Sequence, residues 1–237
     1  MVFDPMGDEL AAARACEAEI FLNTYGNTLG ELRMEYGPYE DASVFIALLE
    51  PDGTALAACR IVTPGPAGLK SLNDAARPPW FADGLRSARA AGMDVERTWD
   101  VATIGVRPDA ASSRMFAAAA LYHGIFVGAR ANGIRSIVMV MDERARRLLT
   151  SASVITQTLP GTGPGPYLGS PASTPLYGHL AQMADVQRRV NPDAHRLIGL
   201  GIGLDGVSVP EPAAFRLDEH RLIAAARAES SLLATSA

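Results

Sequence analysis

The sequence predicts an α/β (α+β) protein built on one twisted mixed sheet with helices on its faces. The apolar runs 43–49 and 55–62 flank an Asp-Gly pair, which is the strongest short-range signal for a β-hairpin. Farther along, the apolar runs 98–106 and 136–141 are each followed by a helical pattern. A hairpin followed by strand, helix, strand and helix gives a mixed sheet covered by helices.

The composition is that of a globular protein with a sizeable core. The chain has 237 residues, of which 48% are hydrophobic. Its 21 basic and 26 acidic residues give a formal net charge of −5, which argues against a binder of nucleic acid or of anionic membranes. The first ten residues carry acids where a signal peptide needs basic residues, and no apolar run approaches the length of a membrane span. We therefore expect a cytoplasmic protein without membrane insertion.

Local patterns predict the elements of the first half. Apolar residues at helical spacing from Glu9 to Tyr25 indicate an amphipathic helix. Residues 24–42 contain three glycines and a proline, so this segment is expected to be partly loop. A short helix is expected over 69–76, ended by the prolines that follow it, whereas 81–97 has no clear pattern.

The second half is less regular. Asp142 is expected to begin a helix over 142–151. Pro and Gly dominate 160–175, which predicts a long irregular connection that is either functional or a join between parts of the fold. A helix over 176–190, one or two strands over 195–209 and a final helix over 218–230 complete the prediction.

Several common kinds of site lack their sequence signals. There is no P-loop and no Gly-x-Ser-x-Gly elbow, and the glycines of 199–206 do not lead into a helix as a dinucleotide site requires. The four histidines are far apart, and Cys16 and Cys59 are too few and too scattered for a zinc site or a disulfide framework. We therefore expect no metal, and structural thiols.

A charge inside an apolar strand is the first candidate for chemistry. Arg60 has only apolar neighbours in the run 55–62, and a charge there must be paired or must face a cleft. Asp100, near the start of the run 98–106, is the natural counter-charge. The pair is either a structural ion pair that fixes the register of the sheet or a pair that holds a substrate.

The junction after Val106 is the second candidate. A helix N-terminus attracts phosphate, and here Arg107 and Arg114 flank it while Ser112 and Ser113 can donate hydrogen bonds. Either serine, or Asp109, is a plausible N-cap for a long helix that ends at 131.

Basic residues concentrate around this junction. Between 107 and 147 there are seven arginines and three acids, a net +4 on a chain that otherwise carries −9. This stretch suits an anionic partner. The alternative is an ordinary solvated helix face, made of Arg130, Arg135, Arg144, Arg146 and Arg147.

These features resemble the GNAT acyltransferases, and among them the acyl-homoserine-lactone synthases and N-acyl amino acid synthases. Residues 59–74 (CRIVTPGPAGLKSLND) are similar to that family's arginine-bearing strand, Thr/Gly/Pro loop and short leucine helix. Residues 99–106 (WDVATIGV) resemble its Trp-Glu-x-Ser-Arg-Phe-x-Val strand. The likeness covers about residues 10–160, which would form an acyl-donor-binding core of 1–160, with 161–237 completing the same domain.

The resemblance implies an enzyme that moves an acyl group from a thioester to an amine of a small molecule or amino acid. The acyl chain would lie where two central strands splay. Asp100 would be the base, Glu40 the second choice, and Arg60 would match the strand arginine. The remaining implied contacts are Trp99, Thr103 and Tyr39 to substrate, and Val106, Arg107, Ser112, Ser113 and Arg114 to the donor.

The sequence also departs from the family. Thr103 stands where the family has arginine, the family's glutamate is shortened to Asp100, and 107–114 replaces the Gly-rich pyrophosphate loop of coenzyme A users. The resemblance implies acyl-CoA as one donor. The departures favour a second donor, acyl-phosphopantetheine carried by an acyl carrier protein. That carrier protein would dock on the basic side chains of Arg130, Arg144, Arg146 and Arg147. The departures also leave two alternatives, a GNAT-like module that binds or regulates without turnover, and a site in the C-terminal third.

Overall fold

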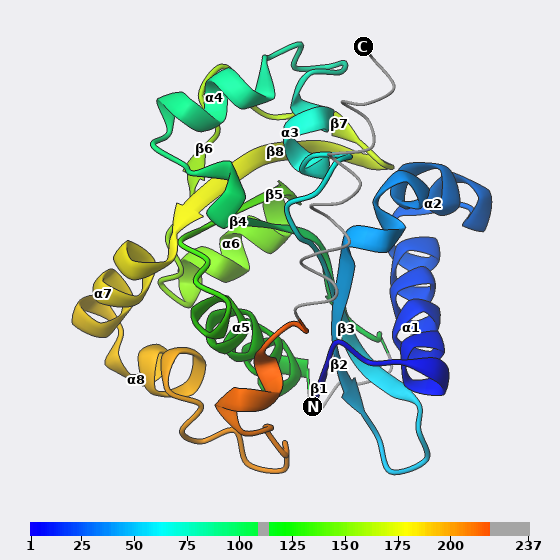
Figure 1. Ribbon diagram of the computed structural model, residues 1–237, viewed down its shortest axis with the longest axis vertical. Coiled ribbons are helices and arrows are strands. Elements are labelled where there is room, and N and C mark those ends of the chain that lie inside the picture. The colour runs from blue at the N-terminus through cyan, green and yellow to red at the C-terminus, as the bar shows by residue number, and fades with distance from the viewer. Residues whose placement is uncertain (109–113, 219–237) are drawn as a thin grey trace.

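The computed structural model describes residues 1–108 and 114–218 and has the predicted mixed α/β architecture (Figure 1). Its sheet has the strand order β1-β2-β3-β4-β5-β8-β6, with β7 paired to β8. The strands are β1 Val2–Phe3, β2 Ser43–Leu49, β3 Ala55–Val62, β4 Thr98–Val106, β5 Ser136–Asp142, β6 Gln157–Thr158, β7 Gly165–Tyr167 and β8 Ser170–His179. The helices are α1 Gly7–Tyr25, α2 Leu29–Tyr36, α3 Lys70–Ala75, α4 Gly84–Ala90, α5 Arg114–Ala131, α6 Glu143–Ser151, α7 Leu180–Val190 and α8 Pro192–Ala194.

The predicted hairpin, β4 and the helix beginning at Asp142 are confirmed. Strands β2 and β3 pair antiparallel from Ser43↔Val62 to Leu48↔Ala57, and Gly53 takes a left-handed φ of 87° in the turn between them. Asp142 caps α6 with its side chain, which accepts a hydrogen bond from the Ala145 backbone.

The central strands β4 and β5 separate soon after they meet. Their parallel pairing runs from Thr98↔Ser136 to Asp100↔Val138, although β4 continues to Val106 and β5 to Asp142. On its other edge β4 contains a bulge: Ile61 pairs with Val101 and Arg60 with Thr103, so Ala102 is the extra residue. The side chains of Ala102 and Thr103 consequently both face α1.

The two faces of the sheet are covered differently. Helices α5, α6 and α7 enclose the largest apolar cluster, which includes Trp99, Leu121 and Met139. The opposite face carries two smaller clusters, one under α1 and one under α3 and α4. In Figure 1, α1 and α2 lie to one side of the sheet and α5 and α7 to the other. Buried charged side chains, described below, occupy the space between the two smaller clusters.

Residues 160–190 correct the sequence prediction. The expected irregular connection contains β7 and the start of β8, and the expected helix over 176–190 begins only at Leu180. Residues 173–179 of β8 pair with the whole of β5, including Pro175 opposite Val140. Proline has no N–H for a ladder and is rare in inner strands, which is why the sequence pattern suggests a loop.

One further prediction holds only in part, and another is wrong. The segment 24–42 is loop at 26–28 but otherwise helical, because Thr28 and Glu31 form a capping box that begins α2, and a 3₁₀ turn spans Gly37–Ala42. The strands expected over 195–209 are replaced by a π-helical turn and irregular chain, since left-handed glycines such as Gly203 (φ 93°) interrupt any strand. The helix expected over 218–230 lies almost wholly outside the described residues.

Within 1–108 and 114–218, no helix combines the length and the apolar character needed to cross a membrane.

We expect Gly84→Ala to lower the free energy of unfolding by disturbing the contact between α4 and α3. A Cβ at Gly84 would lie 2.1 Å from the carbonyl oxygen of Leu72, so α4 and α3 must move apart. Overpacking of this kind costs about 1–3 kcal/mol, measurable by urea unfolding. Gly37→Ala is the matched control, because a Cβ there meets nothing within 4 Å. Equal stability of the two variants would contradict the close packing of α3 and α4.

Candidate functional site

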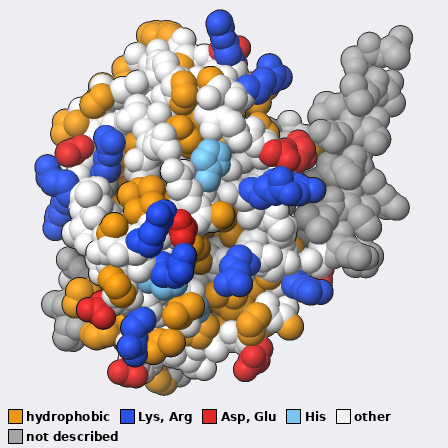
Figure 2. Space-filling view, turned by 90° about the vertical axis from the view of Figure 1, so that its left-hand side faces the viewer, with side chains coloured by type: hydrophobic (Ala, Val, Ile, Leu, Met, Phe, Trp, Pro, Cys, Tyr) orange, Lys and Arg blue, Asp and Glu red, His pale blue; other side chains and the backbone are white. Residues whose placement is uncertain are grey.

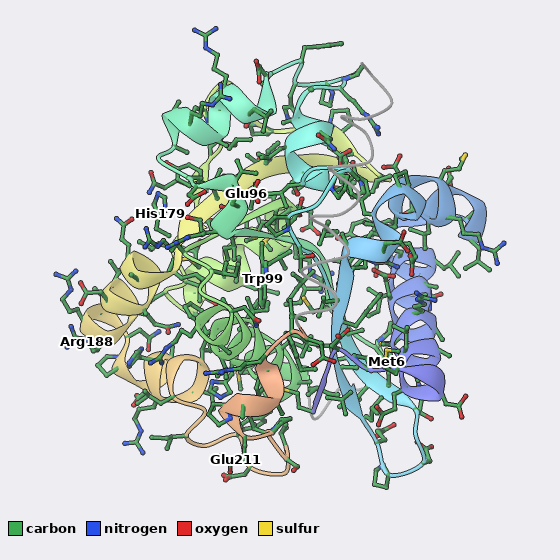
Figure 3. The ribbon with its side chains drawn as sticks, viewed as in Figure 1. Met6, Glu96, Trp99, His179, Arg188 and Glu211 are labelled. Carbon is green, nitrogen blue, oxygen red and sulfur yellow. The ribbon has the colours of Figure 1, made fainter. Side chains whose placement is uncertain are left out.

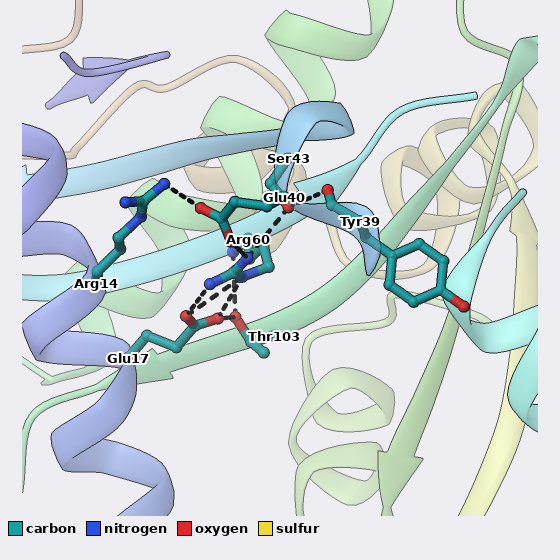
Figure 4. Close-up of polar contacts among 7 residues, drawn as sticks. All are labelled: Arg14, Glu17, Tyr39, Glu40, Ser43, Arg60 and Thr103. Carbon is teal, nitrogen blue, oxygen red and sulfur yellow. Dashed lines mark hydrogen bonds and ion pairs between the residues drawn. The ribbon is translucent and has the colours of Figure 1, made fainter. Parts of the chain in front are cut away.

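Arg60 is the centre of a buried ion cluster (Figure 4). Its Nη2 donates to Glu17 of α1 at 2.7 Å, and its Nη1 donates to Glu40 at 3.0 Å and to Ser43 Oγ at 3.2 Å. Thr103 Oγ1 donates to Glu17 at 2.6 Å and accepts from the Arg60 backbone N–H at 3.2 Å. Thr103 therefore completes the cluster in the position where the resembling family has an arginine.

Protein groups alone supply hydrogen bonds and counter-charges to the Arg60 guanidinium, without a substrate. The Arg60 guanidinium also packs on the rings of Tyr36 and Phe45, 4.8 and 4.7 Å from their centroids. Burial lowers the pKa of Arg60, but hydrogen bonds and charge from Glu17 and Glu40 outweigh it and leave the pKa raised. Because Arg14 also binds Glu40, both carboxylates are engaged by protein groups.

The predicted Arg60–Asp100 pair is wrong. Asp100 is opposite Val62 in the sheet, whereas Arg60 is opposite Thr103, so the two charges are displaced along the strands. Asp100 instead accepts hydrogen bonds from the backbone N–H of Ser71 and, at 2.8 Å, from its hydroxyl. Asp100 is completely buried, and burial raises its pKa to about 7 although the bonds from Ser71 lower it.

A second ion cluster surrounds Lys70, the only lysine of the chain. Its side chain is 2% exposed and donates to Glu35 at 2.9 Å, to Asp74 at 2.6 Å and to the Tyr167 hydroxyl at 2.8 Å. Tyr167 in turn donates to Asp74 at 2.6 Å. The Tyr36 ring lies between the two clusters: its centroid is 4.8 Å from Arg60 Cζ and 5.1 Å from Lys70 Nζ. Sequence reasoning missed this cluster; the chain's single lysine, placed at the start of a short helix, was its only signal.

An apolar cavity opens where β4 and β5 part, on the face covered by α5. Its volume is about 20 Å³, enough for about one water molecule. It is lined by β4, β5 and the three helices of that face: Val101, Ile104, Tyr122, Ile125, Phe126, Ile137, Met139, Met141, Leu149, Val154 and Met183.

A second, more polar cavity of about 50 Å³ lies on the opposite face at the same parting of the strands. It is lined by α1, α2, the bulge of β4, the end of β5 and the β7–β8 hairpin: Phe21, Tyr25, Tyr36, Ala102, Val140, Asp142, Tyr167, Leu168, Ser170 and Ser173. We call it the tyrosine cavity. Neither Asp100 nor Arg60 lines either of the two cavities.

Asp142 is the carboxylate of the tyrosine cavity. One oxygen accepts a hydrogen bond from the Tyr25 hydroxyl, and the other accepts from the Ala145 backbone at 2.8 Å. Burial, and then the bond to Asp142, raises the pKa of Tyr25, and burial likewise raises the pKa values of Tyr36 and Tyr167. The three tyrosines therefore stay neutral at physiological pH. Sequence reasoning identified Asp142 only as a helix cap.

The predicted substrate contacts are buried by the protein itself. Trp99 is 1% exposed and stacks on Phe3 within the α5-side core (Figure 3). Tyr39 is 5% exposed, and its hydroxyl accepts a hydrogen bond from Asn73 at 2.9 Å. Trp99, Tyr39 and Thr103 are therefore buried within the protein, and their contact with a substrate stays a prediction.

The predicted donor contacts are only partly placed. Val106 and Arg107 are half-buried at the end of β4, and the Arg107 Nε lies 3.4 Å from a carboxylate of α1. Arg114 begins α5, whereas Ser112 and Ser113 lie outside the described residues.

The arginines proposed for docking come from two elements. Arg130 is at the end of α5, and the seven-residue β5, about 20 Å long, separates it along the chain from Arg144, Arg146 and Arg147 of α6. In Figure 2, Lys and Arg side chains are scattered over the face shown, between acidic and apolar ones. Across 1–108 and 114–218, no three His, Cys, Asp or Glu side chains gather as a metal site would require.

The two arginines that bind Glu40 should differ in importance. Arg60→Met leaves Glu17 charged and buried, which costs about 3–5 kcal/mol in the free energy of unfolding. Arg14→Met removes a half-exposed partner and costs less than about 1 kcal/mol. Urea unfolding of both variants measures the contrast, and similar losses would contradict the buried cluster.

Asp100 should make stability depend on pH. The folded protein keeps the Asp100 proton up to about pH 7, whereas the unfolded chain releases it near its ordinary value of 3.8. Folding therefore becomes less favourable as pH rises from about 4 to 7, by an amount on the order of 4 kcal/mol. Asp100→Asn, whose amide can still bond to Ser71, removes this dependence.

Urea unfolding at pH 4.5, 5.5, 6.5 and 7.5 tests this expectation. The stability of the wild type relative to Asp100→Asn should fall steadily over this series. A constant difference would mean that Asp100 is ionised throughout.

The comparisons with known proteins concern the fold. No protein-family model and no curated protein matches the sequence. A CoA-dependent acyl-homoserine lactone synthase, BjaI, solved with SAM and isopentyl-CoA, matches with a TM-score of 0.53 and 14% identity over 88% of this chain and 90% of that one. FeeM, an N-acyl amino acid synthase from uncultured soil microbes, gives 0.59 and 12% over 78% and 91%. The protein therefore has the GNAT-like fold of these synthases, as its sequence resemblance implied.

Proposed function

We propose that this protein transfers an acyl group from a thioester to a primary amine, and that the two substrates meet where β4 and β5 part. One observation carries the proposal: the apolar cavity and the tyrosine cavity open on opposite faces of the sheet at the same break. Successive residues of a strand point to opposite faces, and Met139 lines the first cavity while Val140 lines the second. We propose that the gap between the strands joins the two cavities.

The apolar cavity suits the acyl end of the donor. Its polar lining is almost absent, and Met139, Met141 and Met183 are unbranched side chains that can turn aside to lengthen it. Beyond Asp100, no strand among the described residues pairs with β4 on its β5 edge, so in our proposal the β4 backbone there hydrogen-bonds a thioester carbonyl as charge develops on the oxygen. Val106 and Arg107 lie at the end of this open stretch.

Both kinds of donor fit this proposal. The similar fold of BjaI was solved with isopentyl-CoA, which favours acyl-CoA. Acyl-phosphopantetheine on an acyl carrier protein, docked on Arg130, Arg144, Arg146 and Arg147, is the other donor that we propose to assay.

The tyrosine cavity suits the amine. Asp142 takes a proton from the bound ammonium, and the free amine attacks the thioester carbonyl carbon. The C–N bond forms, the C–S bond breaks, and the thiolate leaves with the second proton of the nitrogen. We propose Asp142 as the base in place of Asp100, because Asp142 borders a cavity and Asp100 is sealed against Ser71.

Thiol release tests this role. We expect the wild type to release thiol from an acyl-CoA series, acetyl to dodecanoyl, only when an amine is present. A colorimetric thiol reagent can follow the reaction because both cysteines of the protein are buried. Asp142→Asn should slow the release by about 100-fold or more, since a general base is lost.

The variant is suited to this test because asparagine caps a helix as well as aspartate does. Asp185→Asn, on the exposed side of α7, is the matched control and should keep the wild-type rate. Unchanged turnover in Asp142→Asn would overturn its role as base. A bound donor with no amine-dependent release from any pair would identify a ligand-binding module instead.

A further inference from the structure

We infer that the acceptor is an alkylammonium ion without a carboxylate, held in the tyrosine cavity by Asp142 and the surrounding aromatic rings. The inference rests on the proposed function for the role of the cavity, and it chooses one substrate class over the amino acids that the family resemblance allows. Four properties of the cavity support it: its charge, its rings, the commitment of the nearby cations, and its size.

The charge around the cavity favours a cation. Two buried cations, Arg60 and Lys70, lie behind its tyrosines. They are outnumbered by carboxylates of the same region, namely Glu17, Glu35, Glu40, Asp74 and Asp142. Arg14 and Arg77 also bind this set, but both are about half exposed or more, and water screens them. A cation entering the cavity therefore meets a net negative field.

The rings favour the same ligand. Phe21, Tyr25, Tyr36 and Tyr167 come from three different elements and all border the cavity. Phe21 lies against both Tyr25 and Tyr36, with ring centroids 5.5 and 6.4 Å apart. Aromatic faces attract ammonium groups, and the attraction strengthens where water is excluded. Since the tyrosines stay neutral, Asp142 supplies the only full charge among the lining residues.

Among the described residues, the cavity offers no cationic partner to a carboxylate. None of its lining residues is Arg, Lys or His. The nearest buried cations are already paired, Arg60 with Glu17 and Glu40, and Lys70 with Glu35 and Asp74. The charge of Arg144 lowers the pKa of Tyr25, but the Arg144 side chain is exposed to solvent. An α-amino acid would bring its carboxylate close to Asp142 with no compensating charge, which is costly in a partly buried site.

The size of the cavity leads to the same conclusion. A volume of about 50 Å³ holds about three or four water-sized groups. An ammonium group and the first two methylenes of an unbranched amine fill this space. A carboxylate on the α-carbon adds three heavy atoms, for which a cavity of this volume has no room.

Direct binding of two matched ligands tests the inference. 2-Aminobutanoate is n-propylamine with a carboxylate on the α-carbon, so titration calorimetry without any donor compares the classes. We expect n-propylamine to bind at least tenfold more tightly to the wild type. Asp142→Asn should weaken n-propylamine at least tenfold, and the control Asp185→Asn should not. Tyr25→Phe, which keeps the ring, should bind it more tightly than Tyr25→Leu.

Equal binding of the two ligands, or unchanged binding of n-propylamine to Asp142→Asn, would overturn the inference. Its failure is distinguishable from failure of the proposed function. Thiol release driven by amino acids but not by alkylamines would support acyl transfer and overturn the acceptor class. Tight binding of n-propylamine with no thiol release from any donor would support the cation site and overturn acyl transfer.

Discussion

The early separation of β4 from β5 is the constraint on which the rest of the site depends. The two strands share three register pairs, and then each continues without the other. An open edge inside a sheet leaves backbone polar groups without partners and room on both faces. The bulge at Ala102 bends β4 away at this point and turns two successive side chains toward α1. Both cavities follow from this geometry, because each is the space left on one face by the parting strands.

The two buried ion clusters hold the walls of this opening in place. Arg60 ties β3 to α1 through Glu17 and to the 3₁₀ turn through Glu40, while Lys70 ties α3 to α2 and to β7. Buried ion pairs add little net stability, but losing one partner is expensive. Such clusters therefore fix one arrangement of the surrounding elements. We interpret them as the frame of the tyrosine cavity, since every charge in them is engaged by another protein group.

Features with local signals could be predicted from the sequence, and features made by distant contacts could not. The hairpin, β4 and the helix after Asp142 each depend on neighbouring residues, such as a turn glycine or a capping carboxylate. The partner of Arg60 is on α1, 43 residues away, whereas Asp100 is opposite Val62 on the far side of a one-residue bulge. Strand β8 contains two prolines, so local preference opposes the structure that tertiary pairing imposes.

The contacts of Thr103 and Asp100 show what replaces the family's sequence pattern in this protein. Thr103, where the family has an arginine, donates a hydrogen bond to Glu17, so among the described residues Arg60 is the one arginine bound to that carboxylate. Asp100, where the family has the longer glutamate, accepts hydrogen bonds from Ser71 and so holds α3 in place. In our proposal, residues that resemble catalytic ones in sequence are structural, and groups that the motif does not contain perform the chemistry. Asp142 and the rings around it come from the ends of α1, α2 and β5 and from the Pro- and Gly-rich β7–β8 hairpin. Because the hairpin lines the tyrosine cavity, we propose that this late segment sets the acceptor specificity on a shared fold.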